Sequence, residues 1–260
     1  MNTSVSQNDA AATDEDPLAG LVPVTVEGET SGNLAAPAGM AGMAGDFSQK
    51  DFVIPGLKIV AKTGVLSDEF TPGNIVYNKE IVLSDGKDPV MVIPLSLRKV
   101  WVEEVDYDSG IMPRRFEALS EAHAAGFSNE WGSEKRVVEQ ATIIFLVPIE
   151  EGHASLEAPE HLRPFIEKQN NRAGCKEPKF GYTRAMFVCQ GSAYNAVAKP
   201  LITAGFSGHL RSGLHHGTFA LTSHIKNFKT NSWWAPKLVS AGKNSPEMVE
   251  WLDEEVVLLW

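Results

Sequence analysis

Short apolar runs separated by turn residues dominate the chain from about residue 52 onward. These runs predict strands at 57–62, 74–83, 89–105, 137–150, 180–190, 216–228 and 232–241. Clusters of Gly, Pro, Asn and Asp, such as SDGKDP at 84–89, separate them. Pro94 lies inside the third run, and because proline cannot donate to a strand ladder it predicts a break or a bulge there.

Helical spacing is confined to three shorter segments. Residues 114–127 are typical of a short helix, and residues 192–206 begin with Ser192 as a predicted N-cap. Pro200 lies within the second segment and predicts a kink or an interruption. Residues 245–260 predict a terminal amphipathic helix that packs on the domain, with a free acidic tail as the alternative.

This pattern of many short strands and few helices predicts a mainly β, α+β fold. Many short strands at regular spacing, with two or three helices, favour a barrel or a sandwich over a βαβ fold. Residues 1–46 are rich in Ala, Gly, Ser, Thr and acids, so we expect a disordered, low-complexity acidic arm. The predicted organisation is this arm, one folded domain over 47–244, and an acidic C-terminal helix or tail over 245–260.

Charge is distributed unevenly along the 260 residues, whose net charge is −10. Residues 1–46 and 247–260 contain seven and five acids and neither lysine nor arginine. Residues 172–246 contain ten lysines and arginines against one acid, Glu177. A block of this kind indicates an anion-binding surface, most often for nucleic acid. The alternative is a solvated basic face that balances the acidic half of the domain, and charge does not separate the two.

Other features narrow the setting and the chemistry. The first residues lack the basic and apolar regions of a secretory signal, and no apolar run approaches the roughly 20 residues of a membrane helix. The two cysteines, Cys175 and Cys189, are too few for a disulfide framework. We therefore expect a cytoplasmic protein with no contact to a membrane. Phosphate loops, dinucleotide motifs and nucleophile elbows are absent from the sequence, so we expect no enzyme activity and no cofactor.

Two clusters contain the residue types that bind metal ions. The acids Glu103, Glu104, Asp106 and Asp108 could hold a divalent cation and support a metal-dependent nuclease, but a solvated hairpin end is the favoured interpretation. His209, His215 and His216 with the two cysteines could bind zinc. Adjacent histidines on a strand diverge and neither cysteine is in a CxxC pair, so no metal site is predicted. A hydrolase dyad of Cys189 with a histidine has no support beyond composition.

Aromatic residues are interleaved with the basic block, as in proteins that bind single-stranded nucleic acid through a positive groove and stacking rings. In FGYTRAMF, alternation places Phe180, Tyr182 and Arg184 on one face. Adjacent Trp233 and Trp234 face opposite ways on a strand, so at least one should be outside the core. The full set of predicted nucleic-acid-binding residues is Lys99, Trp101, Arg114, Arg115, Lys179, Phe180, Tyr182, Arg184, Arg211, Lys226, Lys229, Trp233 and Trp234.

The order of segments also carries a family resemblance. IPGLKIVAK, PGNIVYNKE, VMVIPLSLRKVWVE and FALTSHIKNFKTNSWWAPKLV occur in that order over roughly residues 52–240. This order resembles that of bacteriophage and prophage single-stranded DNA-binding proteins with an OB-like fold. The Lys99-x-Trp101-x-Glu103 step and the late strand with Leu221 and Thr222, followed by Asn227, Lys229 and the paired tryptophans, match their recurring pattern. The segment after PGNIV departs from it, having Tyr77-Asn78-Lys79-Glu80 in place of a Thr-Gly-Glu turn.

The resemblance implies an elaborated OB-like β-barrel with two or three helices, which would be the nucleic-acid-binding domain over 47–244. It also implies a non-enzymatic protein that coats single-stranded DNA without sequence preference in phage replication or recombination, in the cytoplasm of the host cell. Its partners would be single-stranded DNA and, through the acidic C-terminus, replication or recombination proteins, and a homo-oligomer is left open. The alternative is a phage structural or protein-interaction protein, such as a virion component or a host-directed inhibitor, that does not bind nucleic acid.

Overall fold

The fold is described from a computed structural model of the chain. It describes residues 53–106, 109–170, 179–207 and 210–257. All of these lie in the second of two units, Lys50–Trp260. The expected N-terminal arm, together with Cys175, His209 and Asp108, lies outside the described residues.

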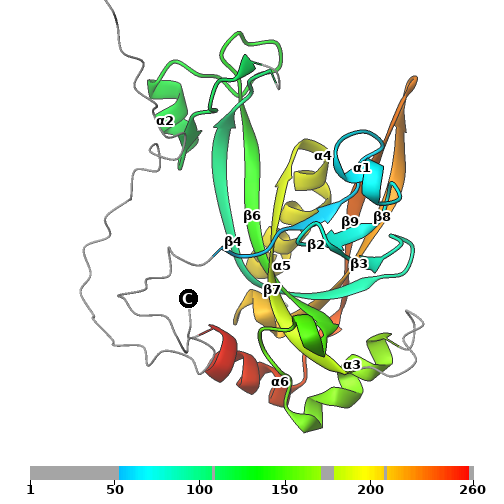
Figure 1. Cartoon of the computed structure of the whole chain (residues 1–260). Coiled ribbons are helices and arrows are strands. Elements are labelled where there is room, and N and C mark those ends of the chain that lie inside the picture. Colours follow the sequence, from blue (N-terminus) through cyan, green and yellow to red (C-terminus); the bar gives the residue numbers. More distant parts are fainter. Residues whose placement is uncertain (1–52, 107–108, 171–178, 208–209, 258–260) are drawn as a thin grey trace, which may run out of the picture. The chain divides into compact units, whose positions relative to one another are not determined.

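The strands form two antiparallel sheets (Figure 1). A three-stranded sheet has the order β1 (Leu57–Ile59), β2 (Ile75–Tyr77) and β3 (Ile81–Ser84). The larger sheet has the order β7 (Phe180–Gln190), β6 (Val137–Glu150), β4 (Val90–Glu103), β8 (Gly217–Phe228) and β9 (Asn231–Lys243), with β5 (Arg115–Phe116) beside β4. The predicted mainly β, α+β class is confirmed. A closed barrel is not found among the described strands, because β7 and β9 are the two ends of an open path.

Strand β4 is the longest element together with β6, at 14 residues each. Its first residues, Val90–Val92, pair with β8, whereas Ile93–Glu103 pair with β6. The register shifts between Pro94 and Ser96, so proline produces the predicted bulge rather than a break. One strand therefore takes part in both halves of the sheet, and the bulge lies just beyond the point where its partner changes.

Two other sequence predictions differ from the structure in detail. The run 74–83 is split into β2 and β3, because Asn78 and Lys79 adopt positive φ values of 50° and 61° and make a tight turn. The segment 114–127 begins as strand β5, and its helix is restricted to α2 (Leu119–Ala124). A helix that the pattern did not predict, α3 (Arg163–Asn170), follows β6.

Helices cover both faces of the larger sheet. After α1 (Leu66–Glu69), the long helical run comprises α4 (Gly191–Ala193), a π-helical segment Tyr194–Ala198 and α5 (Lys199–Ser207), so that Pro200 falls in the first turn of α5. The C-terminal run is α6 (Pro246–Trp251) followed by a π-helical segment Leu252–Val257. Ser245 caps α6 by accepting a bond from the Met248 N–H at 3.3 Å. None of the described helices is long and apolar enough to cross a membrane.

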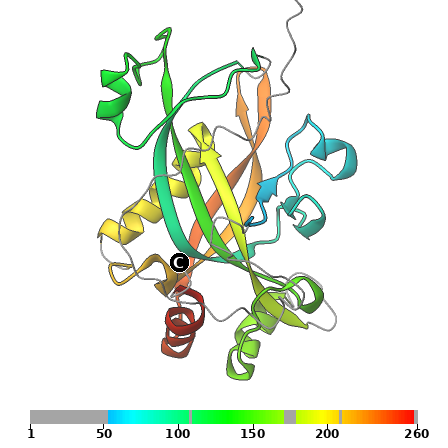
Figure 2. The same ribbon diagram turned by 60° about the vertical axis from the view of Figure 1, so that its left-hand side comes forward.

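The core has a main cluster on each face of the sheet. Ile143, Phe145 and Phe187 pack with Val197 and Leu201 of the long helical run on one face. On the other face, alternate residues Leu146 and Tyr182 pack with α3 and with Met248, Trp251 and Leu252. Figures 1 and 2 show α3 and α6 at one end of the sheet and α2 at the other, beside the tip of β4 and β6. The C-terminal segment thus packs as a helix.

The loop before β2 makes a close contact with the β8–β9 hairpin. A Cβ at Gly73 would lie 2.8 Å from ring carbons of Trp234, and the Ser223 hydroxyl donates to the Gly73 carbonyl. Gly73 also has a positive φ of 100°. The absence of a side chain at Gly73 is what lets the indole lie directly on the loop backbone.

Replacing Gly73 with Ala should therefore reduce stability in two ways. Backbone strain at positive φ costs about 1–3 kcal/mol, and the clash with Trp234 adds an overpacking penalty of about 1–3 kcal/mol. Gly64→Ala is the matched control, because Gly64 has a φ of 122° but no atom within 4 Å of its would-be Cβ. Urea unfolding followed by circular dichroism should give the larger loss for Gly73→Ala, and equal losses would contradict the packing argument.

Candidate nucleic-acid interface

The β8–β9 hairpin projects from the sheet as a two-stranded ribbon (Figure 1). Its regular register pairs Thr222 with Lys237, His224 with Ala235, Lys226 with Trp233 and Phe228 with Asn231. Paired residues in an antiparallel ladder share a face, and alternate residues along a strand do too. We call this set of eight residues the ribbon face: Thr222, His224, Lys226, Phe228, Asn231, Trp233, Ala235 and Lys237.

Positive charge is concentrated on this ribbon. The hairpin from Gly217 to Lys243 contains four lysines and neither Asp nor Glu. Among the described residues, none of Lys226, Lys229 and Lys237 has a carboxylate within ion-pair distance. Burial, followed by the charges of Lys226 and Lys237, holds the pKa of His224 below its usual value. Both lysines therefore lie close enough to His224 to lower its pKa, which agrees with their register on the ribbon face.

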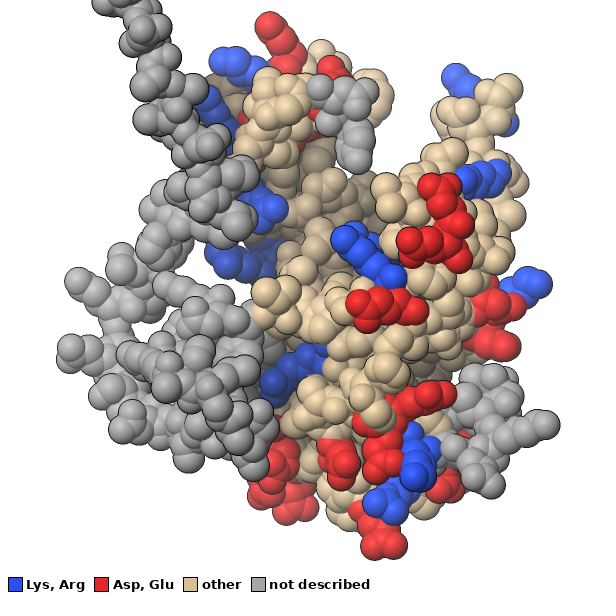
Figure 3. Space-filling model, viewed as in Figure 1, with Lys and Arg blue, Asp and Glu red and all other residues tan. Residues whose placement is uncertain are grey.

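Two aromatic rings accompany these charges. Phe228 is 64% exposed and Trp233 is 37% exposed. The Lys229 ammonium lies 5.6 Å from the centre of the Phe228 ring, in the two-residue turn where Lys229 has a φ of 53°. Figure 3 shows the ribbon as a separate projection with basic side chains at its tip, and the basic residues of the hairpin are all lysines. Cations and accessible rings are thus combined on one narrow surface.

The helical segment Gly191–Lys199 connects the ribbon face to strand β4. The Trp233 indole N–H donates to the Ser192 hydroxyl at 3.3 Å. Two residues further on, the Tyr194 ring lies 5.7 Å from the Lys99 ammonium and 5.9 Å from that of Lys199. The Lys99 ammonium also lies 4.7 Å from the Trp101 ring. Two residues predicted from the sequence, Lys99 and Trp233, therefore contact this helical segment. Two further predicted residues are next to them, since Trp101 lies beside Lys99 and Lys226 lies opposite Trp233 in the ladder.

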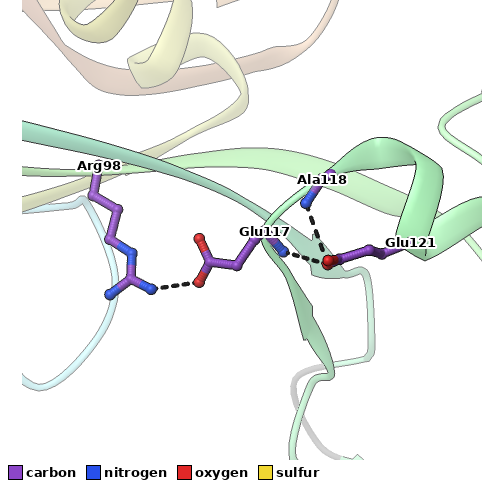
Figure 4. Close-up of polar contacts among 4 residues, drawn as sticks. All are labelled: Arg98, Glu117, Ala118 and Glu121. Carbon is purple, nitrogen blue, oxygen red and sulfur yellow. Dashed lines mark hydrogen bonds and ion pairs between the residues drawn. The ribbon is translucent and has the colours of Figure 1, made fainter. Parts of the chain in front are cut away.

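We call the ends of β4 and β6, together with β5 and α2, the β4–β6 arm. Its cations differ from those of the ribbon because several are paired with acids. Lys99 binds Glu139 at 2.6 Å; burial opposes the charged form, but the carboxylate outweighs it and raises the pKa of Lys99. Arg98 pairs with Glu117, next to the α2 N-terminus where Glu121 accepts the Glu117 and Ala118 N–H groups (Figure 4). These pairs neutralise much of the arm.

Of the other predicted residues on this arm, Arg114 and Arg115 are both exposed. The Arg114 guanidinium lies 5.7 Å from the Phe127 ring, and Arg115 is paired with Val102 in the β4–β5 ladder. Near them, Trp131 is 86% exposed and the Arg136 guanidinium lies 4.4 Å from its ring, while Arg136 also pairs with Glu104 at 2.5 Å. Sequence reasoning did not single out Trp131.

The predicted stripe on β7 is wrong as a binding surface. Tyr182 is only 2% exposed and its ring packs 5.3 Å from that of Trp251, because the C-terminal segment covers this end of the strand. Burial raises the pKa of Tyr182. The Arg184 guanidinium donates to the Val256 carbonyl at 3.0 Å, and Phe180 is half-buried against the same cluster. Lys179 precedes the strand and lies 3.9 Å from Glu151.

Distance separates this group from the ribbon. Phe180 is ten residues from Gln190, where β7 meets α4, and that is up to about 33 Å along a strand. Arg211 is exposed before the turn Leu214–His216, at the base of the hairpin. Trp234 faces the opposite side of the ribbon against Gly73. The structure therefore does not bring the thirteen predicted residues into one groove.

His224, Phe228 and Lys237 complete the ribbon face, and sequence reasoning missed them. The signal was available in the two late strands, because a two-residue turn at Lys229–Thr230 determines which positions pair. Treating the strands as a hairpin with that turn would have placed all three residues beside Lys226 and Trp233.

The weaker catalytic alternatives receive no support from the geometry. Cys189 is buried in the core, and burial raises its pKa to about 11, so it is a neutral thiol at physiological pH. In the acidic run, Glu103 accepts the Arg114 N–H at 3.2 Å and Glu104 pairs with Arg136.

Comparisons with protein-family models, curated proteins and solved structures found no match. The resemblance to phage single-stranded DNA-binding proteins therefore stays a prediction, and the structure defines the chain as an antiparallel α+β domain with a lysine-bearing ribbon.

Removing one ribbon charge should change the titration of its neighbour. Lys226→Gln should raise the pKa of His224, because a nearby positive charge disfavours the imidazolium. Lys243→Gln, at the far end of the hairpin opposite Gly217, is the control and should leave it unchanged. NMR titration of the imidazole protons measures both, and an unchanged pKa in Lys226→Gln would show that the two side chains are not close in solution.

Proposed function

We propose that the protein binds single-stranded DNA on the ribbon face without sequence preference and without catalysis. The observation that carries this proposal is the combination of four lysines, two accessible rings and no carboxylate on one hairpin. Single strands are bound by cations that neutralise phosphates and by rings on which bases stack.

The ribbon face offers the two kinds of contact in alternation. Lys226 and Lys237 lie on opposite strands, and the pair of His224 with Ala235 lies between them on the same face. Trp233 lies directly across from Lys226. From Thr222 to Phe228 the face is about 20 Å long, enough for a short run of nucleotides. In this arrangement Lys226, Lys229 and Lys237 contact phosphates, while Trp233 and Phe228 stack on bases.

In this proposal the bound DNA continues from Trp233 over Ser192 toward Lys199, Lys99 and Trp101. The hydrogen bond from Trp233 to Ser192 and the ring contacts of Tyr194 support this direction. The paired acids on the β4–β6 arm make its contribution smaller than that of the ribbon.

A role in phage DNA replication or recombination, in the host cytoplasm, is the setting that we propose for this binding. Its support is the segment order described for the sequence. The exposed acids Glu254 and Glu255 on the C-terminal helix are the side chains that would contact replication or recombination proteins.

A second candidate function is favoured by exposed apolar residues on the same hairpin. Ile225 is 47% exposed and Val239 is 48% exposed, in addition to Phe228. Exposed apolar residues on a projecting ribbon are typical of protein contacts, as in a virion component or a host-directed inhibitor.

Binding to oligo-dT tests the first proposal. Trp233→Ala should weaken binding about 5- to 150-fold, the equivalent of about 1–3 kcal/mol for a stacked base. Replacing Lys226 or Lys237 with Ala should reduce the slope of log K against log salt by about 0.7 for each lost phosphate contact. Fluorescence anisotropy at several salt concentrations measures both effects.

Lys179→Ala is the control, because Lys179 is also an exposed lysine but precedes β7, at the end of that strand away from the ribbon. It should bind oligo-dT like the unmodified chain. Absence of binding at low salt would overturn the proposal. If light scattering then showed assemblies that Phe228→Ala dissolves, the protein-contact function would take its place.

A further inference from the structure

Two adjacent histidines lie side by side at the base of the hairpin. The turn Leu214–His216 is a 3-10 helix, and the ring centres of His215 and His216 are 4.6 Å apart at an interplanar angle of 53°. The expectation that these side chains diverge assumed a strand. The helical turn overturns it, because successive side chains there are separated by about 120° rather than 180°.

A carboxylate from the C-terminal segment completes the cluster. Asp253 Oδ1 lies 2.8 Å from His215 Nε2. Each of the three residues offers a ligand atom, and these atoms all lie within 4.8 Å of one another. Among the described residues, this is the group of histidine, cysteine and acidic side chains that is close enough to hold a metal ion.

Buried Asn244 holds both parts of the cluster in place. Its side-chain N–H donates to the His215 carbonyl at 2.7 Å, and its backbone N–H donates to the His216 carbonyl at 2.9 Å. The Thr218 hydroxyl in turn donates to the Asn244 side-chain oxygen. The next residue, Ser245, is the cap that starts α6, and α6 leads directly into the segment with Asp253. The histidine backbone and the start of this helix are therefore tied to one side chain.

Burial and charge at the cluster are those of a cation site with one open side. His215 is 8% exposed, whereas the Asp253 side chain is 53% exposed. Glu254 and Glu255 follow Asp253 and are exposed as well, which adds negative potential for an approaching cation. Asp253 also lies in a π-helical segment, a form of helix that is frequent at functional sites.

We propose that His215, His216 and Asp253 bind a Zn²⁺ ion that fastens the C-terminal segment to the base of the hairpin. Two imidazoles and one carboxylate are a donor set that Zn²⁺ accepts, at about 2.0–2.2 Å, with water as the fourth ligand. Ligand atoms around such an ion are about 3.5 Å apart, so small side-chain rotations close the cluster. The ion's charge replaces the direct contact between His215 and Asp253.

The test is a Zn²⁺ titration of the full chain after treatment with a chelator. Isothermal calorimetry should show one ion per chain, and Zn²⁺ should raise the melting temperature further as the logarithm of its concentration over Kd increases. His216→Ala and Asp253→Asn should each weaken Zn²⁺ binding at least tenfold, because each removes a ligand. His123→Ala, an exposed histidine on α2, is the matched control and should bind Zn²⁺ normally.

A second readout separates this site from a simple hydrogen bond between His215 and Asp253. Co²⁺ in place of Zn²⁺ should give the intense visible bands of a four-coordinate ion, and His216→Ala should abolish them. The proposal is overturned if no Zn²⁺ binds, or if it binds equally well to His216→Ala and Asp253→Asn. Both variants keep the core intact, since His216 and Asp253 are partly exposed, so their folding can be verified by circular dichroism without metal.

Discussion

The sharing of strand β4 between two partners is the constraint on which the rest of the structure depends. Its first three residues pair with β8, and the rest of the strand pairs with β6. The change occurs between Val92 and Ile93, and a bulge follows between Pro94 and Ser96, where proline has no N–H to leave unpaired. Because one continuous strand passes through both pairings, the β8–β9 ribbon and the β4–β6 arm are held to the same core.

The two projections use their charged residues differently. On the arm, Lys99, Arg98 and Arg136 are paired with carboxylates, which hold the side chains in defined geometries but leave little net charge. On the ribbon, the lysines have no described acid partner and lower the pKa of His224. Unpaired cations are the ones that attract phosphate, so the ribbon is the stronger candidate for binding an anionic chain.

The acidic C-terminal segment has a structural role that its charge does not suggest. Trp251, Leu252 and Val256 are buried against the sheet, while Asp253, Glu254 and Glu255 remain on the outside. This amphipathic packing buries Tyr182 and partly covers Arg184, and thereby changes which basic residues are accessible. It also brings Asp253 to His215, so that the end of the chain and the base of the hairpin meet at one cluster.

Periodicity in the sequence was sufficient for the strands with strong local signals. The runs 137–150 and 180–190 match β6 and β7, since continuous or alternating β-branched and aromatic residues favour a strand wherever it packs. The mainly β class and an irregularity at Pro94 were predicted on the same local grounds, whereas the predicted cap Ser192 lies inside α4 and Gln190 takes the N-cap position. Only the tertiary structure decided which faces are open to solvent. Alternation places Phe180, Tyr182 and Arg184 on one side of β7, but it does not determine which side α6 covers. Exposure depends on a contact between residues some seventy positions apart, and no local pattern records such a contact.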